Sequence, residues 1–162
     1  MLTVMATACA ARGGVPRPFP GAALPPSATA EPTHADSGVP HAASGVVSRA
    51  LAFLGTPYRN GGSEPSGFDC SGLIQYVYRQ EGLSLPREVS EQYRIGRKVP
   101  LREVRPGDLL FFETVSRGAS HVAIAIGGDQ FVHAPSSKGV VRVERLAASY
   151  WAKRFVGARR VG

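Results

Sequence analysis

A cysteine stands at the start of a helical pattern in the stretch GFDCSGLIQYVYRQEG. Apolar residues follow Cys70 at positions 73, 74 and 77, Asp69 is a typical N-cap, and Gly82 is a typical residue just past a helix end. The N–H groups and dipole of a helix N-terminus stabilise a thiolate. We therefore expect Cys70 to be a nucleophile with a lowered pKa, and Gly72 to allow a substrate or a neighbouring strand to approach closely. A buried, inert cysteine is the alternative.

A cysteine nucleophile needs a base, and the chain has four histidines. His34 and His41 lie in a polar N-terminal region. His121 and His133 lie in strand-like segments with apolar neighbours, where an imidazole without a partner is costly to bury. We expect His121 to act as the base and His133 to hold its imidazole in the required tautomer.

The hairpin HVAIAIGGDQFVHA decides whether these histidines share a face, because side chains alternate along a strand. A three-residue loop over 127–129 places Ala123 opposite His133 and both histidines on one face. A two-residue loop over 128–129 places them on opposite faces. With the longer loop, Ala123 and Ala125 leave room on the histidine face for the helix N-terminus.

The same three residues could form a zinc site, since Cys and His are acceptable zinc ligands. Their spacing is unlike that of any compact zinc motif. We therefore predict no metal and no other cofactor, with the zinc site as the alternative.

The elements that would carry these residues fall into helices first and strands afterwards. A helix is expected from Ser44 to about residue 54, ended by Gly55 and Pro57, and a short helix over 90–96. Strand-like patterns follow in RPGDLLFF, HVAIAI, QFVHA, VVRVERL and RFVGARRV. This order predicts an α+β fold with an antiparallel sheet.

Composition fits one globular domain, with 162 residues of which 43% are hydrophobic. The net charge of +7 favours an anionic partner, but Lys and Arg are scattered without aromatic interleaving, so we predict no nucleic-acid binding. We expect a signal-like segment at 1–9, a flexible tether rich in Pro, Ala, Gly and Ser at 10–43, and a catalytic domain at 44–162.

Six stretches in order resemble the NlpC-type cell-wall cysteine peptidases: GTPYRNGG, GFDCSGLIQYVY, LPREVSEQY, RPGDLLFF, SHVAIAIGGDQFVHAPS and GVVRVERL. The resemblance implies a papain-like α+β fold, with N-terminal helices packed on a central antiparallel β-sheet. It implies a peptidoglycan endopeptidase acting on stem peptides, typically at the bond between γ-D-Glu and diaminopimelate. By motif match, Cys70 is the nucleophile, His121 the base and His133 the third polar residue.

The resemblance implies further site residues. Tyr58 matches a tyrosine whose hydroxyl lies near the nucleophile and assists the oxyanion, although it could be a core residue. Asp69 and Ser71 match positions that contact the stem peptide, especially a free L-Ala amine, and helix capping explains both equally well. Arg87 could meet a substrate carboxylate or lie solvated in a loop.

Other function classes stay open, since fold alone does not fix the bond. They are an amidase or acyltransferase on a related papain-like fold, and a non-catalytic wall-binding module. The segment ATAC resembles a lipoprotein-processing site, in which Cys9 would carry lipid, against an incidental cysteine in a disordered terminus. We expect a monomer at the periplasmic side of the cell envelope, attached as an outer-membrane lipoprotein through Cys9.

Overall fold

The computed structural model describes residues 41–162. The predicted segment 1–9 with Cys9, and residues 10–40 of the predicted tether, lie outside the described residues. Within residues 41–162, none of the helices is long and apolar enough to cross a lipid bilayer.

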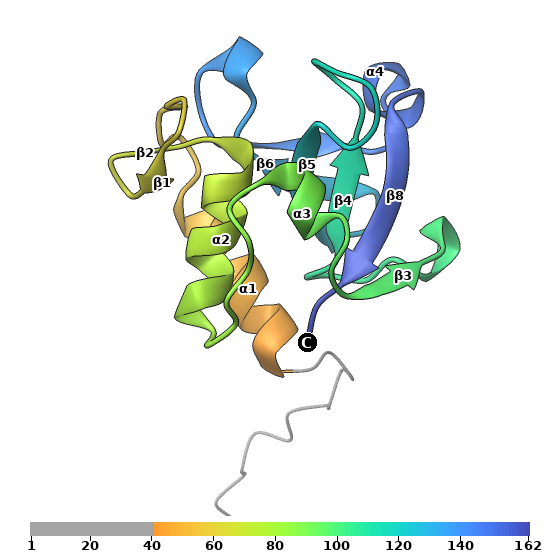
Figure 1. Cartoon of the computed structure of the whole chain (residues 1–162), viewed down its shortest axis with the longest axis horizontal. Coiled ribbons are helices and arrows are strands. Elements are labelled where there is room, and N and C mark those ends of the chain that lie inside the picture. Colours follow the sequence, from red (N-terminus) through yellow and green to blue (C-terminus); the bar gives the residue numbers. More distant parts are fainter. Residues whose placement is uncertain (1–40) are drawn as a thin grey trace, which may run out of the picture. The chain divides into compact units, whose positions relative to one another are not determined.

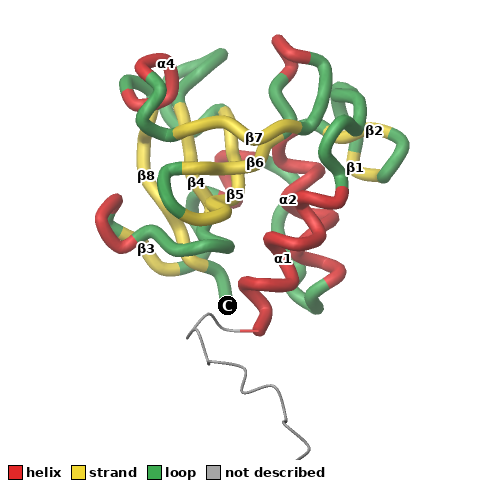
Figure 2. Tube along the Cα trace, turned by 180° about the vertical axis from the view of Figure 1, so that it is seen from behind, coloured by secondary structure: helices red, strands yellow, loops and turns green. Residues whose placement is uncertain are grey.

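The first part of the described chain is helical. Helix α1 (His41–Ala52) begins before Ser44, the predicted start, and α2 (Cys70–Gln80) follows. The side chain of Asp69 accepts a hydrogen bond from the N–H of Gly72, and Gly82 has a φ of 78°, so both predicted helix boundaries of α2 are confirmed. Helix α3 (Val89–Gln92) is a single turn. Figures 1 and 2 show α1 and α2 together on one side of the sheet.

The second part forms a six-stranded antiparallel sheet; an antiparallel sheet was predicted, but its edge strand Arg97–Val99 was not. Its order is β3 (Arg97–Val99), β8 (Phe155–Arg160), β4 (Leu109–Phe112), β5 (His121–Gly127), β6 (Gln130–His133) and β7 (Arg142–Arg145). Smaller elements that the sequence did not predict are β1 (Ser63–Glu64), β2 (Gly67–Phe68), α4 (Ser149–Ala152) and the 3-10 turns Leu101–Glu103 and Ser136–Lys138. The α+β class is therefore confirmed.

Strand β5 contributes side chains to two separate cores. Val122 and Ile124 pack with the helices, in a core that also holds Val46, Leu73, Ile74, Val77 and Val132. Ala123 and Ala125 pack in a second core that also holds Leu110, Phe112, Phe131 and Trp151. The expectation that the two alanines make room for the helix N-terminus is wrong, because aromatic side chains fill the space beside them.

The β5–β6 hairpin has the two-residue loop, Gly128 and Asp129, since β5 ends at Gly127 and β6 begins at Gln130. The strands pair Ile124 with Val132 and Ala125 with Phe131, but Gly127 with Gln130, so the register shifts by one residue between 125 and 127. This irregularity adds one residue to β5. It restores the parity that the short loop would otherwise break, so His121 and His133 share a face by a route that the sequence did not predict.

Candidate active site

Cys70 is the first residue of α2 and is half-buried. Gly72 in the first turn lies against the loop before β1: a Cβ on Gly72 would meet the carbonyl oxygen of Gly62 at 2.0 Å. A close approach at Gly72 is therefore confirmed, but it is made by this loop rather than by a strand. The same carbonyl accepts the N–H of Asp69 at 2.9 Å, so the loop and the helix start are held together.

The electrostatics of Cys70 correct one expectation. Burial raises the pKa of the thiol above its ordinary value, and the Asp69 carboxylate adds to this effect. The N–H groups of Val122, Ser71 and Cys70 itself lower that pKa, as expected for a helix start, but the net direction is upward. The resting thiol is therefore neutral at pH 7 and requires a base.

The candidate base is one of two hydrogen-bonded histidines. The Nε2 atom of His121 lies 2.8 Å from the Nδ1 atom of His133, and both side chains are buried. Burial lowers the pKa of His121 to about 4. Burial, followed by the charges of His121 and Arg142, lowers the pKa of His133 to about 2. Both imidazoles are thus neutral at pH 7 and able to accept a proton.

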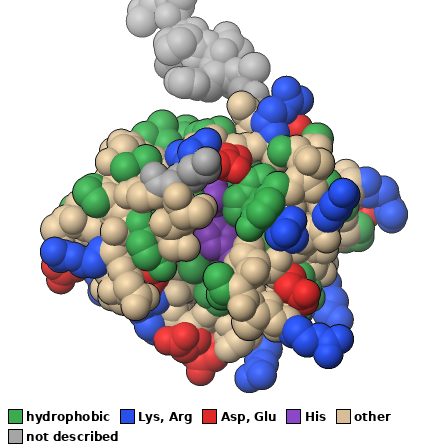
Figure 3. All heavy atoms as spheres, turned by 90° about the horizontal axis from the view of Figure 1, so that it is seen from above, with side chains coloured by type: hydrophobic (Ala, Val, Ile, Leu, Met, Phe, Trp, Pro, Cys, Tyr) green, Lys and Arg blue, Asp and Glu red, His purple; other side chains and the backbone are tan. Residues whose placement is uncertain are grey.

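Cys70 and the histidine pair lie at the same end of the sheet. The backbone N–H that contacts the Cys70 sulfur belongs to Val122, the residue after His121 at the start of β5. Figure 3, seen from above Figure 1, shows histidine side-chain atoms at the surface of this end, between hydrophobic side chains. The structure therefore places the residue next to the predicted base against the predicted nucleophile.

Tyr58 belongs to the same site. Burial raises the pKa of its phenol, and the charges of Cys70 and Asp69 raise it further, whereas Arg87 lowers it. Its backbone N–H donates to Gly139 at 2.7 Å, which fixes the segment before the helix. The phenol is half-buried and close enough to Cys70 for an electrostatic interaction, which fits the predicted supporting role.

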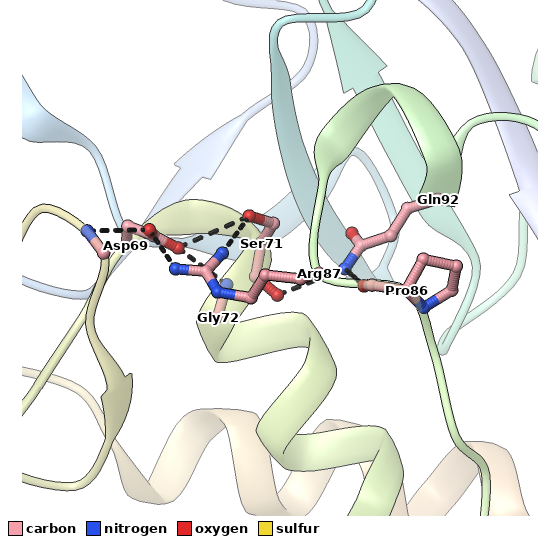
Figure 4. Close-up of polar contacts among 7 residues, drawn as sticks. Asp69, Ser71, Gly72, Pro86, Arg87 and Gln92 are labelled. Carbon is pink, nitrogen blue, oxygen red and sulfur yellow. Dashed lines mark hydrogen bonds and ion pairs between the residues drawn. The ribbon is translucent and has the colours of Figure 1, made fainter.

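Asp69, Ser71 and Arg87 form one polar cluster beside the helix start (Figure 4). Arg87 donates to the Ser71 hydroxyl at 2.7 Å and forms an ion pair with Asp69. Asp69 also accepts the N–H groups of Gly61 at 3.0 Å and Gly72 at 2.7 Å. The guanidinium group of Arg87 is therefore held by Ser71 and Asp69, and the interpretation of a solvated loop arginine is wrong.

Gln92 was not singled out from the sequence. It is fully buried, and its amide nitrogen donates to the carbonyl oxygens of Pro86 at 2.8 Å and Ser71 at 3.2 Å (Figure 4). It thereby ties the segment that carries Arg87 to the first turn of α2. No local pattern in the sequence marks this long-range contact.

Known proteins are similar to this chain over most of the described residues. The sequence model of the NlpC/P60 family matches residues 55–160. The chain belongs to the NlpC/P60 family. It is 43% identical over 120 residues to a gamma-DL-glutamyl hydrolase of Bacillus subtilis, covering 72% of this chain and 29% of the relative. It is 43% identical over 119 residues to the murein DD-endopeptidase MepS/murein LD-carboxypeptidase of Escherichia coli, covering 73% and 62%.

Solved structures of NlpC/P60 proteins share the fold. A lipoprotein-like family member from Staphylococcus aureus has a TM-score of 0.68 and 38% identity, covering 74% of this chain and 41% of that chain. The papain-like NlpC-type fold implied by the six sequence stretches is confirmed. The chain spans less than two thirds of the length of these three relatives.

Two residues beside the histidine pair of this NlpC/P60 domain were missed. Trp151 stacks on His121, with ring centroids 5.5 Å apart, and meets His133 edge-on at 4.9 Å. Its indole N–H donates to Glu144 on β7. Trp151 is the one tryptophan of the sequence, and this could have drawn attention to it. Nothing in the sequence marks Glu144 as a neighbour of the histidines.

The geometry of the pair also bears on the zinc alternative. The facing nitrogens of His121 and His133 point at each other rather than at a shared third point. Among residues 41–162, no group of three or more His, Cys, Asp and Glu side chains is arranged to hold a metal ion. The arrangement is a direct hydrogen bond between two imidazoles.

Proposed function

We propose that this NlpC/P60 domain is a cysteine peptidase that hydrolyses the stem peptides of peptidoglycan. The observation that carries the proposal is the hydrogen-bonded pair of His121 and His133 at the sheet end where α2 presents Cys70. The relatives named as a gamma-DL-glutamyl hydrolase and a murein endopeptidase support this substrate class. A net charge of +7 suits an anionic polymer.

The chemistry follows from the neutral groups. His121 donates its Nε2–H to His133, so its Nδ1 lone pair takes the Cys70 proton as the sulfur attacks the scissile carbonyl carbon. The N–H of Cys70 and the hydroxyl of Tyr58 stabilise the oxyanion. The tetrahedral intermediate collapses to a thioester, and the departing amine takes the proton from His121. Water then adds to the thioester and gives a proton to His121; the second intermediate releases the acid, and His121 returns that proton to the departing Cys70 sulfur.

The cluster of Asp69, Ser71 and Arg87 is the proposed contact for the stem peptide. Asp69 is the acceptor for a free L-Ala amine, and Ser71 lies beside it. The Arg87 side chain keeps 32% of its surface exposed, so its outer edge is open to a substrate carboxylate. The ion pair between Arg87 and Asp69 would hold this recognition surface in shape before substrate arrives.

The proposed bond is that between γ-D-Glu and diaminopimelate. Digestion of purified peptidoglycan by the full chain, with mass spectrometry of the soluble fragments, tests this. We expect fragments that end in D-Glu and fragments that begin with diaminopimelate. Cys70→Ala should release none, while Cys9→Ala, which removes the other cysteine, should behave as wild type.

Each alternative gives a different result. An amidase would release whole stems from glycan, an acyltransferase would join fragments, and a binding module would sediment with the wall and release nothing. Cleavage between D-residues instead would retain the cysteine mechanism and refute the proposed bond. Activity of Cys70→Ala equal to wild type would refute the mechanism itself.

The proposal extends to location in the cell envelope, on the periplasmic side, with lipid on Cys9 as the attachment. The lipoprotein-like segment ATAC supports it. Membrane fractionation of wild type and Cys9→Ser after expression from the upstream region tests the anchor. Equal recovery of both forms in the membrane pellet would refute it.

A further inference from the structure

His133 has one ring nitrogen with a partner and one without. Its Nδ1 atom faces His121 at 2.8 Å, whereas its Nε2 atom is buried and has no hydrogen-bond partner among residues 41–162. An unpaired polar atom in a buried position is costly, and it marks a place where a group acts electrostatically or moves. An acidic group near this Nε2 atom could therefore determine whether the atom carries a hydrogen.

That group is the carboxylate of Glu144. Its Oε1 atom lies 3.9 Å from the Nε2 atom of His133, beyond hydrogen-bond distance but close enough for the carboxylate charge to act on the dipole of the neutral imidazole. The backbone register fixes this approach, because His133 pairs with Arg142 and Val132 with Val143 across β6 and β7. Glu144 lies one residue further along β7.

Two neighbours hold the carboxylate in place. The Nε atom of Arg142 lies 2.8 Å from Oε1, and the indole N–H of Trp151 donates to Oε2. The same indole ring packs against both imidazoles. Glu144 thus belongs to a rigid arrangement that surrounds the histidine pair, rather than to a solvated strand edge.

The position of the proton on each neutral imidazole decides whether the pair can work. If His121 donates from Nε2, its Nδ1 is free to accept the thiol proton, and His133 must carry its own hydrogen on Nε2. If His133 donates from Nδ1 instead, His121 carries its hydrogen on Nδ1 and cannot act as the base there. A negative charge next to Nε2 of His133 favours a hydrogen on that atom.

We propose that Glu144 is a positioning residue, whose carboxylate selects the Nε2–H tautomer of His133 and thereby leaves Nδ1 of His121 free as the base. The inference rests on the proposed function, because it assigns a role within the same site. Glu144 touches neither substrate nor sulfur in this role. It acts through His133, in a chain that runs from Cys70 through both histidines to β7.

The tautomers can be read without substrate, by long-range 1H–15N NMR of the imidazoles in the full-length protein at pH 7. In wild type we expect both His121 and His133 to carry hydrogen on Nε2. In Glu144→Ala we expect a mixed population, with hydrogen on Nδ1 of His133 in part of the molecules. A wild-type spectrum with Nδ1–H on His133 would overturn the proposal even if no variant folded.

Kinetics supply the second readout. Glu144→Ala should lower kcat about tenfold to a hundredfold with little change in KM, and Glu144→Gln, which keeps an oxygen acceptor, should lie between it and wild type. Glu91→Gln, at an exposed position, is the matched control. Wild-type kcat and tautomers in Glu144→Ala would also overturn the proposal. An inactive wild type with the expected tautomers would instead count against the proposed function alone.

Discussion

A β-carbon on Gly72 would lie 2.0 Å from the carbonyl oxygen of Gly62. Real Cβ atoms do not approach backbone oxygens so closely, so the loop before β1 can lie on the start of α2 only because residue 72 lacks a side chain. The contact holds the loop against the helix turn that carries Cys70. The position of Cys70 therefore depends on the absence of a side chain at residue 72.

Gly72→Ala should therefore affect both stability and activity. We expect a loss of about 1–3 kcal/mol in the free energy of unfolding, measured by urea denaturation, because the loop must move away. We expect kcat/KM to fall about a hundredfold as Cys70 shifts. Gly82→Ala is the control: it strains a residue at φ 78° but meets no atom within 4 Å, so it should cost stability and spare activity. Wild-type activity in Gly72→Ala would contradict this account.

Tyr58→Phe tests the phenol hydroxyl. If the hydroxyl binds the oxyanion, its removal should lower kcat about tenfold to a thousandfold while KM changes little. Tyr150→Phe, at a residue that is 49% exposed, is the matched control and should have no effect. A tenfold to thousandfold rise in KM with unchanged kcat would instead show that the Tyr58 hydroxyl binds substrate and transition state equally well.

The acid limb of the activity profile should lie unusually low. Burial lowers the pKa of His121 to about 4, so the base stays neutral until the pH falls to that range. We expect kcat/KM on a soluble stem peptide to be half-maximal near pH 4 on the acid side. A midpoint near 6.5, the ordinary value for histidine, would mean that the imidazole is better solvated than its burial indicates.

Stability should depend on pH through the same histidines. Their pKa values are lowered in the folded state, so between pH 6.5 and 4 the unfolded chain binds protons that the folded chain excludes. Stability is therefore highest above pH 6.5 and falls by about 1.4 kcal/mol per pH unit for each histidine as the pH drops.

Replacement of His133 by Gln should make this dependence shallower, as measured by urea denaturation at pH 7, 6, 5 and 4. His34→Gln changes a histidine outside the described residues and serves as the control. Parallel pH curves for wild type and His133→Gln would contradict the burial of a neutral imidazole at this position.

Alkylation reports on the thiol directly. Burial raises the pKa of Cys70, so the rate of its reaction with iodoacetamide should keep rising above pH 8.5. Mass spectrometry of a Cys9→Ala protein isolates the reaction of Cys70. A rate that is already constant at pH 7 would indicate a preformed thiolate and a site unlike the one described.

The sequence predicted best what short-range chemistry determines. Asp69 and Gly82 bound α2 because a helix start needs an acceptor and a helix end favours positive φ, and both needs are local. Cys70 at the start of that helix follows from the same pattern. Its pKa does not, because burial by distant strands outweighs the local N–H groups.

Residues brought in by strand register were harder to predict. Glu144 reaches His133 because β6 and β7 pair in one register, and Trp151 reaches both histidines from a short helix after β7. The assignment of Ala123 to the helix side failed for a related reason: alternation gives two faces but does not say which face the helices cover. Only tertiary packing decides that.

The extra residue in β5 has a consequence for comparing this domain with its relatives. A loop of 128–129 with an irregular strand, and a longer loop with regular strands, both leave the two histidines on one face. Both arrangements have the same number of residues between His121 and His133, so a relative that lacks one of those residues needs a second change in its hairpin to keep both histidines on one face. In an alignment, a single gap between the two histidines therefore predicts a changed strand register in that relative.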